Sequence, residues 1–292
     1  MPDAASVAIY CINKQYSDHE TKSTHDATRH PTMSTPWPDT APPPPGHDLS
    51  ALPAGVAAAL WRGDALGGGD TRTVPSGHAA LDAALPGGGW PCQALTEILS
   101  PQPALCEWRL LGPGLRALAG AGGPVVLVGP PRDPHLPGLL QAGLRARDLV
   151  WIDARTVAER LWAAEQLLQS QPEGGALLVW LPQVRAVALR RLQVRAQRCA
   201  CPVFLFRPDS AAHEASPAPL RVAVLPAADW HLRVRLLKRR GPALDGVLDL
   251  PAVPAGLARL LTPRLLPTAA ASPEVNPHVQ TLLVRPAARV HH

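Results

Sequence analysis

The residues whose types and order point to chemistry lie between Val74 and Trp108. Pro86 and the three glycines after it end a short amphipathic helix, because proline lacks a backbone donor and glycine tolerates positive φ. A short apolar strand is expected at 94–99, a Ser-Pro turn follows it, and a helical pattern begins directly afterwards. Strand, turn and helix in this order gather backbone amides around phosphate in nucleotide-binding proteins. The stretch therefore has the layout of a phosphate-binding loop.

The side chains of this loop are not those that hold a phosphate. In register with the Walker A consensus G-x-x-x-x-G-K-[ST], the chain starts at Ser100 and ends with Leu105, Cys106 and Glu107. Leu105 replaces the glycine of the turn, Cys106 replaces the lysine that neutralises phosphate, and Glu107 replaces the hydroxyl that binds Mg²⁺. A carboxylate about 4 Å from a phosphate charge is unfavourable by roughly 4 kcal/mol at an effective dielectric near 20. We therefore predict a degenerate P-loop that does not bind nucleotide.

The order S-G-x-x-x-L-D-x-x-L-x-G-G-G-x-P-x-x-x-x-x-E-I, from Ser76 to Ile98, resembles the opening of the ATP-binding core in RecA-type recombinases. With Trp61-Arg62-Gly63-Asp64 upstream and 237–241 (LKRRG) downstream, the chain resembles the ImuA family, RecA-like proteins of bacterial inducible-mutagenesis operons. The likeness extends in order over residues 60–247. It implies an α/β fold: a RecA-like core with a mostly parallel central sheet flanked by helices, a C-terminal β-hairpin and disordered tails.

The same resemblance locates the other two parts of an ATPase. In the recombinases the strand matching 124–129 ends in acidic residues that include the catalytic glutamate, but here Gly129 is followed by two prolines. The Walker B position, at the end of the apolar run 177–181, needs an aspartate, and the chain has Trp180-Leu181-Pro182 there. The lysine, the base and the magnesium carboxylate are all replaced. We predict that the protein is not an enzyme and has no cofactor or metal.

Resemblance to ImuA implies an accessory role in damage-induced (SOS) translesion DNA synthesis and mutagenesis. The protein would be an adaptor among ImuB, an error-prone DNA polymerase, RecA and DNA. ImuB is itself a catalytically inactive relative of Y-family polymerases. Two alternatives stay open. The first is a cell-division inhibitor of SulA type, because some ImuA proteins are labelled SulA-like, and the second is an active RecA-like ATPase.

Composition sets the class of protein. Apolar residues make up 46% of the 292 residues, enough for a sizeable core, and the net charge of +5 with a pI near 9.3 allows contact with a polyanion without requiring it. The five cysteines are odd in number and scattered, which favours a reducing compartment over a disulfide framework. With no apolar run of 18 residues, we expect a cytoplasmic protein without a membrane span. Cys199 and Cys201 are expected to pack in the core and not to bind zinc.

Four segments are predicted along the chain. Residues 1–47 lack any helix or strand period and are rich in His, Ser, Thr and Pro, so we expect a disordered extension, within which Met33 could begin the chain as well as Met1. Residues 48–70 read as an N-terminal helix and a Gly-rich linker, and 71–250 as the core domain. Residues 251–292 read as a flexible, basic tail rich in Pro and Ala.

Hydrophobic periodicity predicts the remaining elements of the core. Thr156 and Glu159 form a capping box that begins a helix. Gly112-Pro113-Gly114 is expected to kink or divide the helix at 104–118. The other predicted helices are 133–144, 156–170 and 184–198, and the strands are 124–129, 149–152, 177–181 and 203–206. Residues 207–219 read as a polar loop, followed by a β-hairpin of 220–225 and 232–237.

Two groups of basic residues are candidates for binding DNA or an acidic partner. The first gathers on one face of the helix at 184–198, with hardly an acidic residue between its members: Arg190, Arg191, Arg195 and Arg198. The second lies on and after the last predicted strand: Arg233, Arg235, Lys238, Arg239 and Arg240. The alternative for both groups is a solvated face of an ordinary helix or strand. Self-association is compatible with either interpretation.

Overall fold

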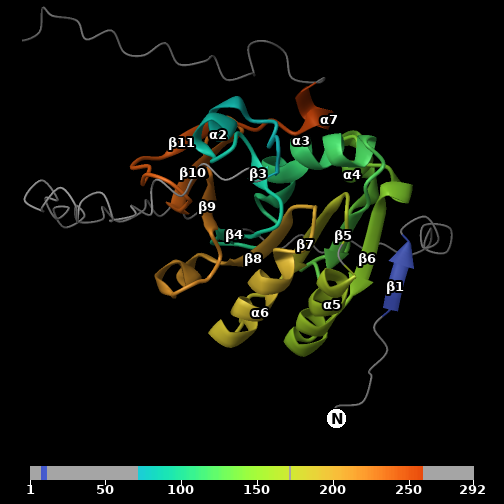
Figure 1. Cartoon of the computed structure of the whole chain (residues 1–292). Coiled ribbons are helices and arrows are strands. Elements are labelled where there is room, and N and C mark those ends of the chain that lie inside the picture. Colours follow the sequence, from blue (N-terminus) through green and yellow to red (C-terminus); the bar gives the residue numbers. More distant parts are fainter. Residues whose placement is uncertain (1–7, 12–71, 171, 259–292) are drawn as a thin grey trace, which may run out of the picture.

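The computed structural model describes residues 8–11, 72–170 and 172–258, which form an α/β structure around one large sheet (Figure 1). The sheet has nine strands in the order β1-β6-β5-β7-β8-β4-β9-β10-β11, and a separate two-stranded sheet pairs β2 with β3. Six neighbouring strands of the large sheet run parallel, namely β6, β5, β7, β8, β4 and β9. Antiparallel strands extend it at both edges, β1 on one side and β10 with β11 on the other.

The strands are short and mostly apolar. Their bounds are β1 Ala8–Cys11, β2 Thr73–Val74, β3 Trp90–Pro91, β4 Leu95–Ser100, β5 Val125–Val128, β6 Leu149–Asp153, β7 Ala176–Trp180, β8 Val203–Pro208, β9 Leu220–Pro226, β10 His231–Lys238 and β11 Leu248–Pro251. Every residue of β4 and β7 is buried, which is typical of parallel strands covered on both faces. The prediction of a mostly parallel central sheet flanked by helices is confirmed.

Helices cover both faces of the sheet, so the fold has three layers (Figure 1). One face packs against α2 (Ala79–Ala84), α3 (Glu107–Gly120) and α4 (Leu136–Gln141). The opposite face packs against α5 (Val157–Gln169) and α6 (Ala186–Ala196), which lie side by side. The short elements are the 3₁₀ helices η4 (Ala146–Asp148) and η5 (Asp209–His213) and the last helix, α7 (Ala255–Ala258).

Local sequence signals account for several of these boundaries. The Thr156–Glu159 capping box is formed: the threonine hydroxyl accepts from the Glu159 amide at 3.2 Å, and the Glu159 carboxylate accepts from the Thr156 amide at 3.0 Å. The predicted inner face of α6 is buried as well, since Ala188, Leu189 and Leu192 are no more than 6% exposed.

Helix α3 differs from the prediction in two respects. It starts at Glu107 and not at 104, and it continues without division through Pro113. The two glycines beside Pro113 have different surroundings. A Cβ on Gly114 would lie 2.9 Å from the Pro75 carbonyl oxygen, whereas a Cβ on Gly112 would meet no atom within 4 Å. Gly114 thus lets the segment before α2 pack closely on α3.

The predicted limits of the core were too narrow at both ends. Residues 8–11 form β1 on the free edge of β6, which is contrary to the prediction that all of 1–47 is disordered. At the other end Ala252 is 5% exposed and its amide donates to the Trp230 carbonyl at 3.0 Å, so this residue belongs to the core and not to the predicted tail. Pairing with a distant strand is not visible in local periodicity. The predicted helix and linker at 48–70 lie outside the described residues.

The described helices are all too short or too polar to cross a bilayer.

Candidate functional site

The residues aligned with the Walker A consensus lie where a ligand site is expected in an open α/β sheet. Residues 101–106 form the turn from the carboxyl end of β4 to the start of α3. The helix after β4 covers one face of the sheet and the helix between β7 and β8 covers the other. Such a reversal produces a crevice at the carboxyl ends of the strands, which is where ligands bind in this architecture. The local prediction of strand, turn and helix is correct.

The turn is occupied by a side chain of the protein itself. The Glu107 carboxylate is buried, and its Oε1 accepts from the Ala104 amide at 2.7 Å while its Oε2 accepts from the Cys106 amide at 3.0 Å. Ala104 has a φ of 64°, a left-handed conformation that turns the backbone back toward the carboxylate. Amides arranged in this way form a concave anion site. Here the anion is Glu107, which also lies favourably at the N-terminus of α3.

The Walker B position contributes the third donor to the same carboxylate. Trp180, at the end of β7, donates its indole N–H to Glu107 Oε1 at 3.3 Å. The indole also stacks on Phe206 of β8, with ring centroids 4.6 Å apart and planes at 22°. A tryptophan thus links the ends of β7 and β8 to the start of α3. Where an ATPase would hold magnesium through an aspartate, this chain holds a carboxylate through a hydrogen-bond donor.

The remaining residues of the loop are placed for packing. Cys106 is fully buried. Its burial, and to a smaller extent the charge of the neighbouring Glu107, raise the pKa of its thiol to about 12. It therefore supplies neither the positive charge of a Walker lysine nor a reactive thiolate. The Ser100 hydroxyl donates to the Gln102 carbonyl at 3.2 Å, and the Leu105 side chain is exposed. The position of the recombinase base, after β5, is the turn at Gly129, which has a φ of 56°.

A buried ionic network beside this site was missed in the sequence. Glu97 of β4 is fully buried and accepts from Arg221 Nε of β9 at 2.7 Å. Arg207, at the end of β8, lies 3.6 Å from Glu97 Oε1 and donates to Glu214 at 2.6 Å. Arg221 also donates to the carbonyls of Ala211, Ala212 and Glu214. The network fastens η5 and the segment after it to the sheet, so the predicted loop 207–219 is anchored at both ends. The only indication of this network in the sequence is that Glu97, Arg207 and Arg221 lie within apolar segments.

The arginines on α6 divide into two pairs. Arg191 lies 2.9 Å and Arg195 3.7 Å from the carboxylate of Glu165 on α5, and Arg195 also donates to the Glu165 carbonyl at 2.9 Å. Arg190 and Arg198 are exposed and have no ion pair among the described residues. The sequence has no acidic residue between these four arginines, but the fold brings Glu165 of α5 against two of them.

The basic residues on and just after β10 differ in their surroundings. Arg233 is exposed on β10 and lies opposite Asp249 of β11. Arg235 is half-buried and Arg240 is exposed, and both have interactions within the fold. Lys238 donates to the Ser216 carbonyl at 2.8 Å, and Arg239 donates to the Pro242 carbonyl at 2.7 Å and to the Ala84 carbonyl. Several of these cations thus tie the end of β10 to neighbouring segments.

The cysteines behave as core residues. Cys199 and Cys201 are buried among the apolar residues between α5, α6 and the sheet. Burial raises the pKa of the Cys201 thiol to about 12, and the Cys199 thiol donates to the Leu168 carbonyl at 3.5 Å. Among residues 8–11, 72–170 and 172–258, no three His, Cys, Asp or Glu side chains lie together as metal ligands would.

No known protein family and no curated protein matches this chain. What the site can do therefore follows from its own side chains. An anion of the protein occupies the amides of the turn, and a tryptophan holds it in place.

Proposed function

We propose that this protein is a RecA-like accessory factor without ATPase activity, which acts as an adaptor in damage-induced translesion DNA synthesis. The observation that supports the first part is the Glu107 carboxylate on the amides of Ala104 and Cys106. The second part rests on the resemblance of residues 60–247 to ImuA. By that resemblance the partners are ImuB, an error-prone polymerase and RecA, with DNA as a further candidate.

Electrostatics and space both oppose nucleotide binding in the turn. A phosphate would have to displace Glu107 from its two amide hydrogen bonds and from the Trp180 indole. If the carboxylate stayed near, the repulsion would be roughly 4 kcal/mol at about 4 Å and an effective dielectric near 20. Hydrogen bonds to a charged group contribute about 1.5–3 kcal/mol each, so leaving the amides is also costly. The turn keeps the shape of a phosphate loop while the protein supplies the anion.

Nucleotide binding is the most direct test. Calorimetric titration of the purified chain with Mg-ATP should show no heat of binding and no hydrolysis. A parallel titration of the Cys106→Lys, Glu107→Thr double variant, which restores two Walker residues, serves as the comparison. Mg-ATP bound by the unmodified chain in a manner abolished by Cys106→Ala would overturn the proposal and favour an active ATPase.

The cellular role has its own test. Cells lacking the gene should lose damage-induced mutagenesis and regain it with the unmodified protein. They should regain it equally with Cys106→Ala, because no nucleotide chemistry is required. A block of cell division on overexpression, with mutagenesis unaffected by the deletion, would contradict the adaptor role and indicate a SulA-type inhibitor.

The α6 surface permits a matched test of direct DNA binding. Arg190 and Arg198 have no ion pair among the described residues, whereas Arg191 and Arg195 share Glu165. Changing Arg190 and Arg198 to Glu should weaken binding to duplex DNA and reduce the salt slope by about 0.9 for each phosphate that the arginines no longer neutralise. The Arg191→Gln variant is the control, with a smaller expected effect. Equal affinities for all three proteins would remove α6 from the DNA-binding surface.

A further inference from the structure

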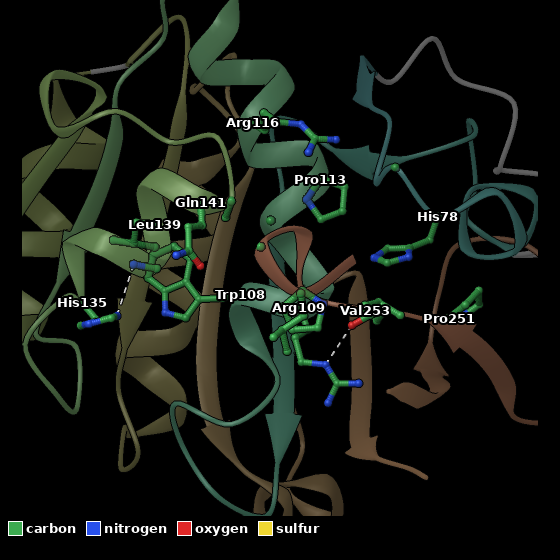
Figure 2. A pocket seen from close by; sticks show the side chains of 18 residues that line it. His78, Trp108, Arg109, Pro113, Arg116, His135, Leu139, Gln141, Pro251 and Val253 are labelled. Carbon is green, nitrogen blue, oxygen red and sulfur yellow. Dashed lines mark hydrogen bonds between the residues drawn. The ribbon is translucent and has the colours of Figure 1, made fainter. Parts of the chain in front are cut away.

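A pocket lies along α3 on the side that carries Trp108, Arg109 and Arg116 (Figure 2). It is a pocket of about 470 Å³ between α3, α4 and the segment 251–257, with the residues before α2 at its rim. Pockets of about 300–1,000 Å³ are typical of ligand sites. Its lining includes none of residues 100–107 and does not include Trp180.

A glycine opens the floor of this pocket. Gly112 lies on α3 and lines the pocket, and a Cβ built on it would meet no atom within 4 Å. A glycine inside a helix costs about 1 kcal/mol relative to alanine. Trp108 of α3 and Leu139 of α4 line the same pocket and lie close together in Figure 2. Val253 and neighbouring prolines add apolar surface on the opposite side. The pocket can therefore accept an apolar side chain.

The charged groups around the pocket are all basic. Its lining holds two arginines and two histidines and no aspartate or glutamate. Arg109 is half-buried, donates to the carbonyls of Ala252 and His231 at 3.0 Å each, and has a pKa lowered by burial. Arg116 is exposed and has no hydrogen bond or ion pair within the described part of the chain. Two guanidinium groups thus border a cavity without a carboxylate partner in its lining.

The direction of these donors is defined by packing. A Cβ on Gly143 would lie 2.6 Å from Arg116 Cδ, so the stem of Arg116 rests closely on the turn after α4. His135 Nδ1 accepts from the Gly138 amide at 3.2 Å, which leaves the Nε2–H of the neutral ring free to donate. The Gly138 amide is thereby taken by a side chain of the protein. Arg109 already donates to two carbonyls, so Arg116 is the guanidinium left to pair with an anion, and one carboxylate is a bidentate partner for it.

We propose that this pocket binds a short peptide segment of a partner protein in which an acidic residue stands next to a bulky apolar one. The apolar side chain fills the space over Gly112, and the carboxylate pairs with Arg116. This inference rests on the proposed adaptor function and names the kind of partner it would engage. The chain's own C-terminal residues fit less well, because 259–292 contain four arginines and a single glutamate. Like charge would oppose their binding beside Arg109 and Arg116.

The binding test uses the purified full chain and three immobilised hexapeptide libraries. The first has a fixed Asp beside positions randomised over Leu, Ile, Val, Phe and Met. The second has Lys in place of Asp, and the third has Asp with Ser at the apolar positions. The first library should retain the protein and the other two should not. Retention that is equal on the first and second libraries would overturn the proposal.

Two variants with a matched control locate the binding. Gly112→Leu fills the pocket, and Arg116→Glu reverses its charge. Gly120→Leu is the control, because Gly120 lies on the same helix, has open space at its Cβ and does not line the pocket. Affinity for a peptide selected from the first library should fall about tenfold or more for the first two variants and stay unchanged for the third. Unchanged affinity of Gly112→Leu would place the peptide elsewhere and refute the proposal.

Two further outcomes separate this inference from its alternatives. If the protein binds AMP but no peptide, and Gly112→Leu abolishes the AMP binding, the pocket is a nucleotide site and the peptide proposal is wrong. Peptide binding at the pocket by a protein whose deletion leaves mutagenesis intact would support the pocket while rejecting the proposed cellular role. Circular dichroism and denaturant unfolding of each variant show whether a reduced affinity comes from the pocket or from an unfolded protein.

Discussion

The two regions on either side of the start of α3 handle charge in opposite ways. In the turn before the helix, a carboxylate of the protein meets two amides and an indole, and no donor of that set is left for a ligand. Along the helix itself, Arg109 and Arg116 border a cavity whose lining contains no carboxylate. The turn has the converging amides of an anion site, and the pocket has the volume of a ligand site. Neither feature alone tells whether the protein satisfies the site itself or leaves it open to a ligand.

The difference lies in which polar groups have partners. Buried donors and acceptors without partners cost about 1–3 kcal/mol each, so a concave region is stable alone only if its own side chains satisfy it. Glu107 does this for the turn. In the pocket, the donors of Arg109 are hydrogen-bonded to backbone carbonyls, but no carboxylate of the lining compensates its positive charge. Arg116 is exposed, and water solvates its guanidinium. The turn is complete without a ligand, whereas the pocket would gain from an anion.

The largest effect should come from removing the internal anion. Glu107→Ala leaves the amides of Ala104 and Cys106 and the Trp180 indole without their acceptor. Because hydrogen bonds to a charged group contribute about 1.5–3 kcal/mol each and do not add fully, we expect a loss of about 3–5 kcal/mol in the free energy of unfolding. Guanidinium denaturation measures it.

A matched variant and an added anion sharpen this prediction. Glu107→Gln keeps the size and one acceptor but removes the charge, so its loss should be smaller, about 1–2 kcal/mol. Inorganic phosphate should restabilise Glu107→Ala more than the unmodified protein, because the freed amides then bind it and ligand binding favours the folded state. Phosphate that stabilises both proteins equally, compared at equal ionic strength in chloride, would show that the turn is not an anion site.

Local signals were sufficient for most elements of the fold. The break at Pro86, the apolar run of β4 and the capping box at Thr156 each act within a few residues, and each appears where the sequence placed it. Residues 8–11 and 251–258 were assigned wrongly because their order depends on partners far away in the chain, β6 for the first and Arg109 with Trp230 for the second. Periodicity cannot report such pairing.

The candidate site was only half visible in the sequence. The replacement of the Walker lysine by Cys106 and of the hydroxyl by Glu107 could be read directly, and it predicted repulsion of phosphate. That Glu107 turns back onto the amides required the left-handed backbone of Ala104, which nothing in its residue type indicates. Glu165, the acid beside the α6 arginines, lies on a neighbouring helix 26 residues from Arg191. The pocket joins residues from four separate segments, and no motif links them.

The second largest change in stability is expected from substituting the two glycines beside Pro113. Gly114→Ala should destabilise the fold by about 1–3 kcal/mol, because its Cβ would lie 2.9 Å from the Pro75 carbonyl oxygen and the segment before α2 would have to shift. Gly112→Ala should instead stabilise it by roughly 0.5–1 kcal/mol, since its Cβ meets only the cavity and alanine favours the helix. Thermal or denaturant unfolding of both variants is the measurement. A loss of stability in Gly112→Ala would mean that the added methyl group contacts other atoms and that the space beside Gly112 is already filled.

The smallest effect concerns His78, at the rim of the pocket. Its ring Nε2 lies 3.2 Å from the Leu110 carbonyl oxygen, and burial lowers its pKa below the ordinary 6.5, against weaker raising effects of the backbone carbonyls and of Asp82. The unfolded chain then binds a proton more readily than the folded one. Stability should therefore fall as the pH drops below about 6.5 toward the folded-state pKa, and should be independent of this group at higher pH.

Replacing the imidazole isolates this contribution. His78→Gln keeps a donor for the Leu110 carbonyl but cannot titrate, so the difference between its denaturation midpoint and that of the unmodified protein should be constant above pH 6.5 and change below it. His213→Gln, at an exposed position outside the pocket, is the control. Parallel profiles for His78→Gln and the unmodified protein would show that the ring is not held neutral by burial. Because burial lowers the pKa of His78, its ring adds no positive charge to the pocket at about pH 7 to 8, and peptide affinity in this range should not follow the titration of His78.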